Sequence, residues 1–135
     1  MTESQHIRIA PSILAADFAD LGAEITAIDK AGADYIHLDI MDGHFVPNLT
    51  MGPKLVADLR RRLPQTFLDV HLMVQQPERF VEPFAEAGAD HLTFHIEATL
   101  GRRAHHERDV IEQVREAGCG VGIALNPATP AGAVG

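Results

Sequence analysis

One stretch of the chain joins a glycine turn to a strand, and it reads Ala31-Gly32-Ala33-Asp34-Tyr35-Ile36-His37-Leu38-Asp39-Ile40-Met41. A glycine just beyond a helix commonly adopts a left-handed conformation, after which the chain turns into its next element. Residues 35–40 are apolar enough, and the segment is short enough, for a buried β-strand. The stretch therefore predicts the end of a helix, a tight turn and a strand.

Four further segments are short, apolar and rich in β-branched residues: 7–14, 67–74, 91–96 and 121–125. The glycine turn recurs before two of them, as Ala87-Gly88-Ala89-Asp90 and as Ala117-Gly118. The stretches between the segments have helical periodicity, and the apolar residues that share a helical face are Phe18, Leu21, Ile25 and Ile28; Leu55, Val56 and Leu59; Phe80, Val81 and Phe84; and Val110, Ile111 and Val114. We expect Pro53 and Pro77 to open two of these helices, where a missing amide costs nothing.

This alternation of strands and helices predicts βαβ units and a parallel sheet. Repeated βα units with glycine turns suit a (β/α)8 TIM barrel, although a doubly wound sheet would show the same pattern. A complete barrel needs roughly 250 residues, whereas this chain has 135 and reaches Gly135 where a fifth helix is expected. We therefore expect a single domain over residues 1–135, either a small open sheet or a partial barrel truncated after about five strands.

Composition narrows the possible partners and location. Apolar residues make up 46% of the chain and charged residues 22%, as in ordinary soluble proteins. The net charge of −8 disfavours nucleic acids and anionic membranes. No apolar run reaches transmembrane length, residues 1–6 lack the features of a signal peptide, and the single Cys119 cannot form an internal disulfide. We predict a cytoplasmic protein with neither nucleic-acid nor membrane partners.

Polar side chains recur with a period of two in two of the expected strands. His37 and Asp39 share one face of the first, and Asp69 and His71 share one face of the second. Two imidazoles and a carboxylate are ligands that zinc, iron, manganese or cobalt would accept. The simpler interpretation is that both histidines are hydrogen-bonded residues of a polar core. Because an unpaired buried carboxylate is costly, Asp39 needs a cation or a function, and we predict a divalent metal site formed by His37, Asp39 and His71.

Longer motifs resemble those of the ribulose-phosphate 3-epimerase family, in the order of its first five strands. They are Ala10-Pro11-Ser12-Ile13-Leu14-Ala15-Ala16-Asp17-Phe18, His37-Leu38-Asp39-Ile40-Met41-Asp42-Gly43-His44-Phe45-Val46-Pro47-Asn48, Asp69-Val70-His71-Leu72-Met73-Val74, Thr93-Phe94-His95-Ile96-Glu97-Ala98 and Ala124-Leu125-Asn126-Pro127. The resemblance implies a (β/α)8 barrel of the ribulose-phosphate-binding type. It also implies a metal-dependent isomerase of the pentose phosphate pathway, which inverts carbon 3 of D-ribulose 5-phosphate to give D-xylulose 5-phosphate.

Carried over residue by residue, the resemblance assigns His37, Asp39 and His71 to the divalent metal. Asp39 also matches one of two proton-transferring acids, and Ser12 and His71 match substrate contacts. In the family, the second acid lies on the seventh strand, and the phosphate-binding turns follow the sixth to eighth strands. We therefore expect residues 1–135 to be inactive alone. We also expect the full-length enzyme to be a homo-oligomer that acts on a small phosphorylated sugar.

Other functions compete with this one. Epimerases of allulose 6-phosphate share most of these motifs, and a non-catalytic metal-binding half-barrel would also fit. Barrel decarboxylases of the Asp-x-Lys-x-x-Asp type are disfavoured, because Met41 stands where their chemistry needs lysine. We expect Met41 and Met73 to line the active site. His95 and Glu97 share a face but receive no role, and Cys119 has no neighbouring base that would make it a nucleophile.

Overall fold

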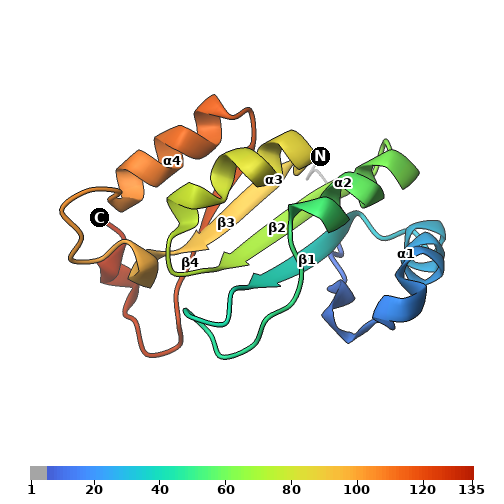
Figure 1. Cartoon of the computed structure of the whole chain (residues 1–135), viewed down its shortest axis with the longest axis horizontal. Helices are drawn as coiled ribbons and strands as arrows, with labels where there is room; N and C mark the ends of the chain where they lie inside the picture. The colour runs from blue at the N-terminus through green and yellow to red at the C-terminus, as the bar shows by residue number, and fades with distance from the viewer. Residues whose placement is uncertain (1–5) are drawn as a thin grey trace, which may run out of the picture.

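The computed structural model describes residues 6–135 as a layer of helices on a parallel sheet (Figure 1). Its helices are α1 Leu21–Lys30, α2 Pro53–Arg62, α3 Val81–Ala87 and α4 Glu107–Glu116, and its strands are β1 Tyr35–Met41, β2 Phe67–Met73, β3 His91–His95 and β4 Gly120–Ala124. Short 3-10 turns cover Ile13–Ala15, Phe18–Asp20, Pro77–Arg79, Ile96–Ala98 and Ala131–Ala133. Residues 1–5, which carry most of the segment that lacks signal-peptide features, lie outside the described residues. Within residues 6–135, no helix has the length and apolar character needed to cross a membrane.

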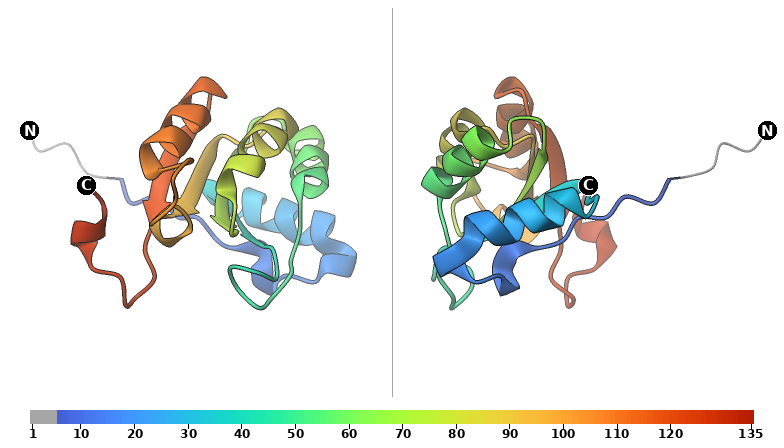
Figure 2. Two further views of the ribbon diagram at one scale, coloured as in Figure 1. Left: turned by 60° about the vertical axis from the view of Figure 1, so that its left-hand side comes forward. Right: turned by 90° about the vertical axis from the view of Figure 1, so that its right-hand side faces the viewer.

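The four strands are parallel and lie in sequence order, β1-β2-β3-β4. The apolar faces of the four helices pack against one face of this sheet (Figure 2). A doubly wound sheet carries helices on both faces, whereas this arrangement is consistent with part of a TIM barrel. The predicted parallel α/β architecture is confirmed, with four strands in place of five.

The prediction of a first strand over residues 7–14 was wrong. This segment runs extended beside β1, where the carbonyl of Ile9 accepts from the amides of Asp34 and Tyr35, and the carbonyl of Pro11 accepts from His37 N at 3.0 Å. It forms one isolated parallel bridge to β1, between Ser12 and His37. Because Pro11 has no N–H to donate in return, a continuous ladder does not form there.

The helix boundaries also differ in two places from the sequence predictions. Pro53 opens α2, as expected, but Pro77 opens a 3-10 turn that the amide of Phe80 closes onto the Pro77 carbonyl. The helix proper, α3, begins four residues later at Val81. Phe18, expected on the buried face of the first helix, lies in a preceding 3-10 turn and is 47% exposed.

The core lies between the sheet and the helices. Side chains of β1 and β2 alternate strictly between buried and half-buried positions. The buried set comprises Ile36, Leu38, Ile40, Leu68, Val70 and Leu72 from the strands, with Leu21, Ile25, Val56, Leu59, Val81, Phe84, Val110 and Val114 from the helices. The opposite face of the sheet therefore carries the polar residues, as the period of two predicts.

The turn at Gly88 fixes how β2 and β3 start. Gly88 has a φ of +111°, and a Cβ at this position would lie 2.7 Å from Cγ of Arg60, so a side chain is excluded by both backbone and neighbour. Arg60 donates from Nη2 to the Gly88 carbonyl at 2.8 Å and pairs with Asp90. Asp90 in turn accepts from the amide of Leu68 at 2.8 Å. These bonds tie α2, β2 and the entry to β3 together.

The buried face of β1 gives a stability prediction. Leu38→Ala should lower the free energy of unfolding by about 2–5 kcal/mol, because the fully buried side chain leaves a cavity. Leu49→Ala makes the same change at a loop position that is 75% exposed, and should cost less than about 0.5 kcal/mol. Urea denaturation followed by circular dichroism measures both. Equal losses in the two variants would contradict the proposed orientation of β1.

Candidate metal centre

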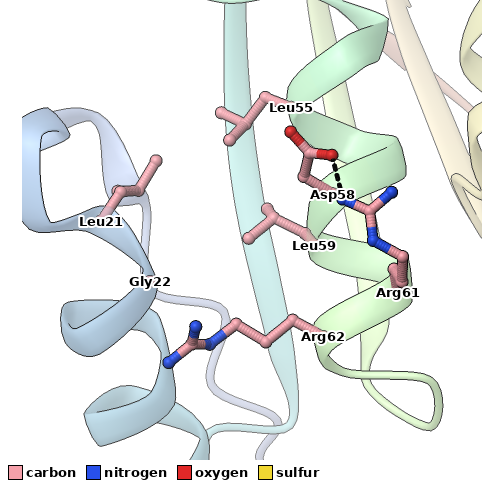
Figure 3. Close-up of a pocket in the computed structure, with 7 residues that line it drawn as sticks. All are labelled: Leu21, Gly22, Leu55, Asp58, Leu59, Arg61 and Arg62. Atoms are coloured by element: carbon pink, nitrogen blue, oxygen red, sulfur yellow. Dashed lines mark hydrogen bonds and ion pairs between the residues drawn. The ribbon is translucent and has the colours of Figure 1, made fainter.

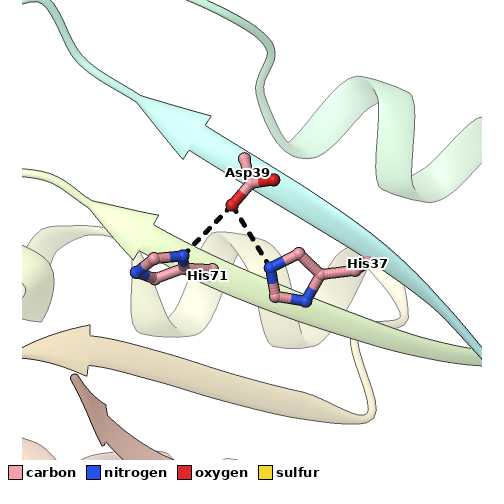
Figure 4. Close-up of side chains that lie close together, drawn as sticks. All are labelled: His37, Asp39 and His71. Atoms are coloured by element: carbon pink, nitrogen blue, oxygen red, sulfur yellow. Dashed lines mark hydrogen bonds and ion pairs between the residues drawn. The ribbon is translucent and has the colours of Figure 1, made fainter. Parts of the chain in front are cut away.

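Three predicted ligands come together on the polar face of β1 and β2. Asp39 lies directly opposite His71 in the strand register, and His37 precedes Asp39 by two residues on the same face. One ligand atom from each of the three residues lies within 4.8 Å of the others (Figure 4). The side chains predicted to converge from two strands do converge.

The donor atoms suit a divalent cation. Asp39 Oδ1 lies 3.2 Å from His37 Nε2 and 3.1 Å from His71 Nδ1, so both rings turn a nitrogen toward one carboxylate oxygen. The second oxygen, Oδ2, accepts a hydrogen bond from the hydroxyl of Ser12. Two imidazole nitrogens and a carboxylate oxygen match the preferences of zinc, iron, manganese and cobalt. Small rotations of these side chains would let all three surround one ion.

Asp39 is also held through its backbone. Its carbonyl accepts a hydrogen bond from the hydroxyl of Thr50 at 2.7 Å, and the same hydroxyl accepts from the amide of Met41 at 3.0 Å. The loop after β1 thus returns to contact the strand beside the candidate metal site. At the start of that loop, Asp42 accepts from the amides of Phe45 and Gln75, which links the carboxyl ends of β1 and β2.

The outer nitrogen of His37 contacts a further carboxylate. His37 Nδ1 lies 2.8 Å from Asp69 Oδ2, and Asp69 Oδ1 lies 2.9 Å from Nδ1 of His91. Asp69 is therefore shared by two imidazoles. Sequence reasoning placed Asp69 on this face without giving it a role, although its spacing of two from His71 was a usable signal.

The outer nitrogen of His71 contacts a third histidine. His71 Nε2 lies 2.8 Å from Nε2 of His95, and the two ring planes are inclined by only 22° with centroids 4.9 Å apart. His95 is 6% exposed, and its Nδ1 lies 3.3 Å from Glu97 Oε2. β3 ends at His95, and the 3-10 turn Ile96–Ala98 brings Glu97 back beside it. His95 and Glu97, which sequence reasoning left without a function, thus adjoin the centre.

Burial and neighbouring polar groups have opposite effects on the pKa values of Asp39 and His37. Burial alone would raise the pKa of Asp39, but the Ser12 hydroxyl and the two imidazoles outweigh it and hold that pKa below its usual value. The bond to Asp69 raises the pKa of His37 above its ordinary value, against the effect of burial. Burial lowers the pKa of His71. The centre thus combines an ionised carboxylate with two histidines that differ in proton affinity.

Other predicted site residues lie around the ligands. Ser12 reaches Asp39 from the extended segment beside β1. Met41 and Met73 are register partners at the ends of β1 and β2, on the same face as the ligands. A groove that includes Phe45, Gln75 and Glu97 in its lining opens at the carboxyl ends of the strands, where barrel enzymes place their sites.

A second groove lies away from this face, between α1 and α2. It is lined by Leu21, Gly22, Leu55, Asp58, Leu59, Arg61 and Arg62 (Figure 3). Its one carboxylate, Asp58, is bound by Lys54 and Arg61 of its own helix. This lining offers no imidazole or nucleophile, so the groove reflects the packing of two helices rather than a centre for catalysis.

The two ligand histidines should titrate in a defined order. In the metal-free protein, His37 should have a pKa above about 6.5 and His71 one below it. Asp69→Asn should lower the pKa of His37, because its main hydrogen-bond acceptor loses its charge. Histidine proton resonances followed against pH measure these values. A His71 that gains its proton at higher pH than His37 would contradict the electrostatic description.

The same shift predicts how this group contributes to stability. Because the pKa of His37 is higher in the folded than in the unfolded chain, its protonation stabilises the fold fully below about pH 6.5 and ceases to do so as pH rises through the folded value. Unfolding free energies of the metal-free protein and of the Asp69→Asn variant, compared at acid and alkaline pH, isolate this contribution.

Comparison with known proteins identifies the family. The sequence model described as "Ribulose-phosphate 3 epimerase family" matches residues 8–135. The ribulose-phosphate 3-epimerase of Rhodobacter capsulatus is 50% identical over 134 residues, which cover 99% of this chain and 56% of that protein. The enzyme of Synechocystis sp. is 52% identical over 127 residues, covering 94% and 54%, and that of Bacillus subtilis is 50% identical over 124 residues, covering 92% and 54%. This chain spans about half the length of the curated relatives it matches, and it belongs to the ribulose-phosphate 3-epimerase family.

Proposed function

We propose that these residues form the part of a ribulose-phosphate 3-epimerase that binds its metal ion and carries one of its two acids. The observation that supports this most directly is the convergence of His37, Asp39 and His71 on one face of two adjacent strands. Membership of the ribulose-phosphate 3-epimerase family suggests the reaction in which these residues would take part. The substrate would be D-ribulose 5-phosphate and the product D-xylulose 5-phosphate.

In this proposal His37, Asp39 and His71 hold the divalent ion, and Asp39 moves the proton at carbon 3 of the sugar. When bound, the ion supplies Lewis-acid stabilisation of the negative charge that develops on the substrate oxygens. The lowered pKa of Asp39 keeps its carboxylate ionised near neutral pH, and the ionised form is the one that a general base needs. Ser12 donates a hydrogen bond to one oxygen of this carboxylate, and in this proposal its hydroxyl also contacts the substrate.

Inversion at carbon 3 needs a second acid on the opposite face of the planar intermediate. The resemblance assigns that acid, and the turns that bind phosphate, to strands that follow the region matched here. We propose that residues 1–135 are a single partial barrel domain that supplies one wall of such a site. The divalent ion, the phosphorylated substrate, the cytoplasmic location and homo-oligomeric assembly of the full-length enzyme are parts of the same proposal.

Exchange of the substrate proton tests the role of Asp39. The experiment uses the longest protein that the gene for these residues encodes. In that protein, Asp39→Asn should reduce exchange of the carbon 3 hydrogen with deuterated solvent by at least about 100-fold, because the amide cannot accept the proton. Proton NMR of ribulose 5-phosphate in deuterium oxide follows the exchange.

Asp58→Asn is the matched control, since it makes the same change on the exposed surface of α2. It should leave the exchange rate unchanged. Near-normal exchange in Asp39→Asn, with an intact circular dichroism spectrum, would assign the base to another residue. Parallel assays with allulose 6-phosphate separate the two epimerase activities, and faster turnover of the hexulose phosphate would replace the proposed substrate.

Residues 1–135 expressed alone should show no epimerisation, because the second acid and the phosphate-binding turns are supplied by other segments in the family. The unpaired edge of β4 should also favour association with other chains. Zinc- or manganese-loaded samples assayed beside the longer chain give the comparison, and sedimentation reports association. Turnover within about tenfold of the longer chain would show that these residues suffice.

A further inference from the structure

We propose that the two histidines of the metal site are held in opposite tautomers by two separate hydrogen-bond chains. One chain runs from His37 to Asp69, and the other runs from His71 through His95 to Glu97. Nε2 of His37 and Nδ1 of His71 are thereby the nitrogens left free to bind an ion. The inference rests on the metal site of the proposed function, and it assigns positioning roles to residues other than the three predicted ligands.

The first chain fixes His37. A carboxylate accepts hydrogen bonds and donates none, so the 2.8 Å contact with Asp69 Oδ2 requires a hydrogen on His37 Nδ1. The other oxygen of Asp69 accepts from His91 Nδ1 at 2.9 Å, so each oxygen of the carboxylate has its own imidazole partner. The remaining nitrogen of His37, Nε2, faces Asp39 at 3.2 Å. That is the side on which the ion would lie.

The second chain fixes His71 through an intermediate ring. A neutral imidazole has one donor nitrogen and one acceptor nitrogen. Nδ1 of His95 faces the carboxylate of Glu97, so it is the donor, and Nε2 of His95 is left as an acceptor. His71 Nε2, at 2.8 Å from that acceptor, must then carry the hydrogen. The free nitrogen of His71 is Nδ1, which faces Asp39 at 3.1 Å.

Both chains end on carboxylates that the backbone holds in place. Asp69 lies within β2, in register with His37 of β1 and His91 of β3. Glu97 accepts from the amide of Asn126 through its other oxygen, in the segment that follows β4. Residues of β1, β2 and β3, together with the segment after β4, therefore contribute to the tautomers of the two ligands. Outer partners of this kind orient a metal-binding imidazole and raise its basicity, and losing one typically weakens metal binding about 10- to 100-fold.

Nitrogen NMR tests the inference without any variant. In the zinc-loaded, longest chain that the reading frame encodes, long-range proton–nitrogen spectra report which imidazole nitrogens carry hydrogen. We expect hydrogen on Nδ1 of His37 and on Nε2 of His71, with the zinc-induced shift on the other nitrogen of each ring. Hydrogen on the same type of nitrogen in both rings would overturn the inference, as would the absence of a zinc-induced shift in either ring.

Two variants test the carboxylates. Asp69→Asn and Glu97→Gln should each weaken zinc binding about 10- to 100-fold, measured by competition with a chromophoric chelator. His91→Gln is the matched control for the first, because it leaves the bond between Asp69 and His37 and should change affinity less than about threefold. Retention of wild-type affinity in both carboxylate variants would refute the positioning roles.

A double variant separates tautomer control from a general loss of structure. In a His95→Gln background, the amide oxygen can accept from His71 without help from Glu97. Glu97→Gln should then weaken zinc binding less than about threefold further, whereas it costs about 10-fold or more in the wild-type background. Equal losses in the two backgrounds would show that Glu97 acts through folding instead.

These measurements use zinc alone, so they are independent of the sugar phosphate. The expected tautomers in a protein that leaves ribulose 5-phosphate unchanged would remove the proposed function and keep the inference. Reversed tautomers in an active epimerase would remove the inference and keep the proposed function.

Discussion

The parallel pairing of β1 with β2 is the constraint on which the rest of the structure depends. Their register sets Asp39 opposite His71 and His37 opposite Asp69. A slip of one residue would turn every side chain of a strand to the other face. Leu38 and Val70, both fully buried beneath the helices, oppose such a slip because it would expose them and bury charges. The apolar face of the sheet thus determines the geometry of the polar one.

On the polar face, each carboxylate lies between two imidazoles. Asp39 contacts His37 and His71, and Asp69 contacts His37 and His91. This alternation explains how a sheet can carry ionised groups that are largely shielded from water without leaving them unpaired. Within residues 6–135, no buried side-chain nitrogen or oxygen lacks a hydrogen-bond partner. The arrangement pairs these charges and still leaves the inner nitrogens of His37 and His71 directed toward Asp39.

Much of the fold and of the candidate site could be predicted from the sequence. An alternation of residue types with a period of two indicates which side chains share a face of a strand. The sequence indicated which polar side chains converge, most of the buried residues and the glycine turns such as that at Gly88. It could not state which residues of neighbouring strands stand opposite each other, since register depends on packing against the helices. The contact of His95 with His71 depends on that register, so His95 received no role. Residues 7–14 were mistaken for a strand because their composition is apolar. The effect of Pro11, which has no amide hydrogen to donate, becomes visible only where this segment lies beside β1.

The charges on this face explain why protons and a metal ion would compete for it. With neutral imidazoles, Asp39 and Asp69 leave two negative charges on the paired strands, and a divalent cation would balance them. In acid the same carboxylates favour protons on the rings, and the bond to Asp69 raises the pKa of His37 in particular. Binding of an ion would displace the proton from Nε2 of a protonated His37, whereas the hydrogen on Nδ1 would remain hydrogen-bonded to Asp69 in either state. Asp69 thus makes His37 a stronger base and leaves the choice of ligand atom unchanged, so metal affinity should fall with acidity while the geometry of the site persists.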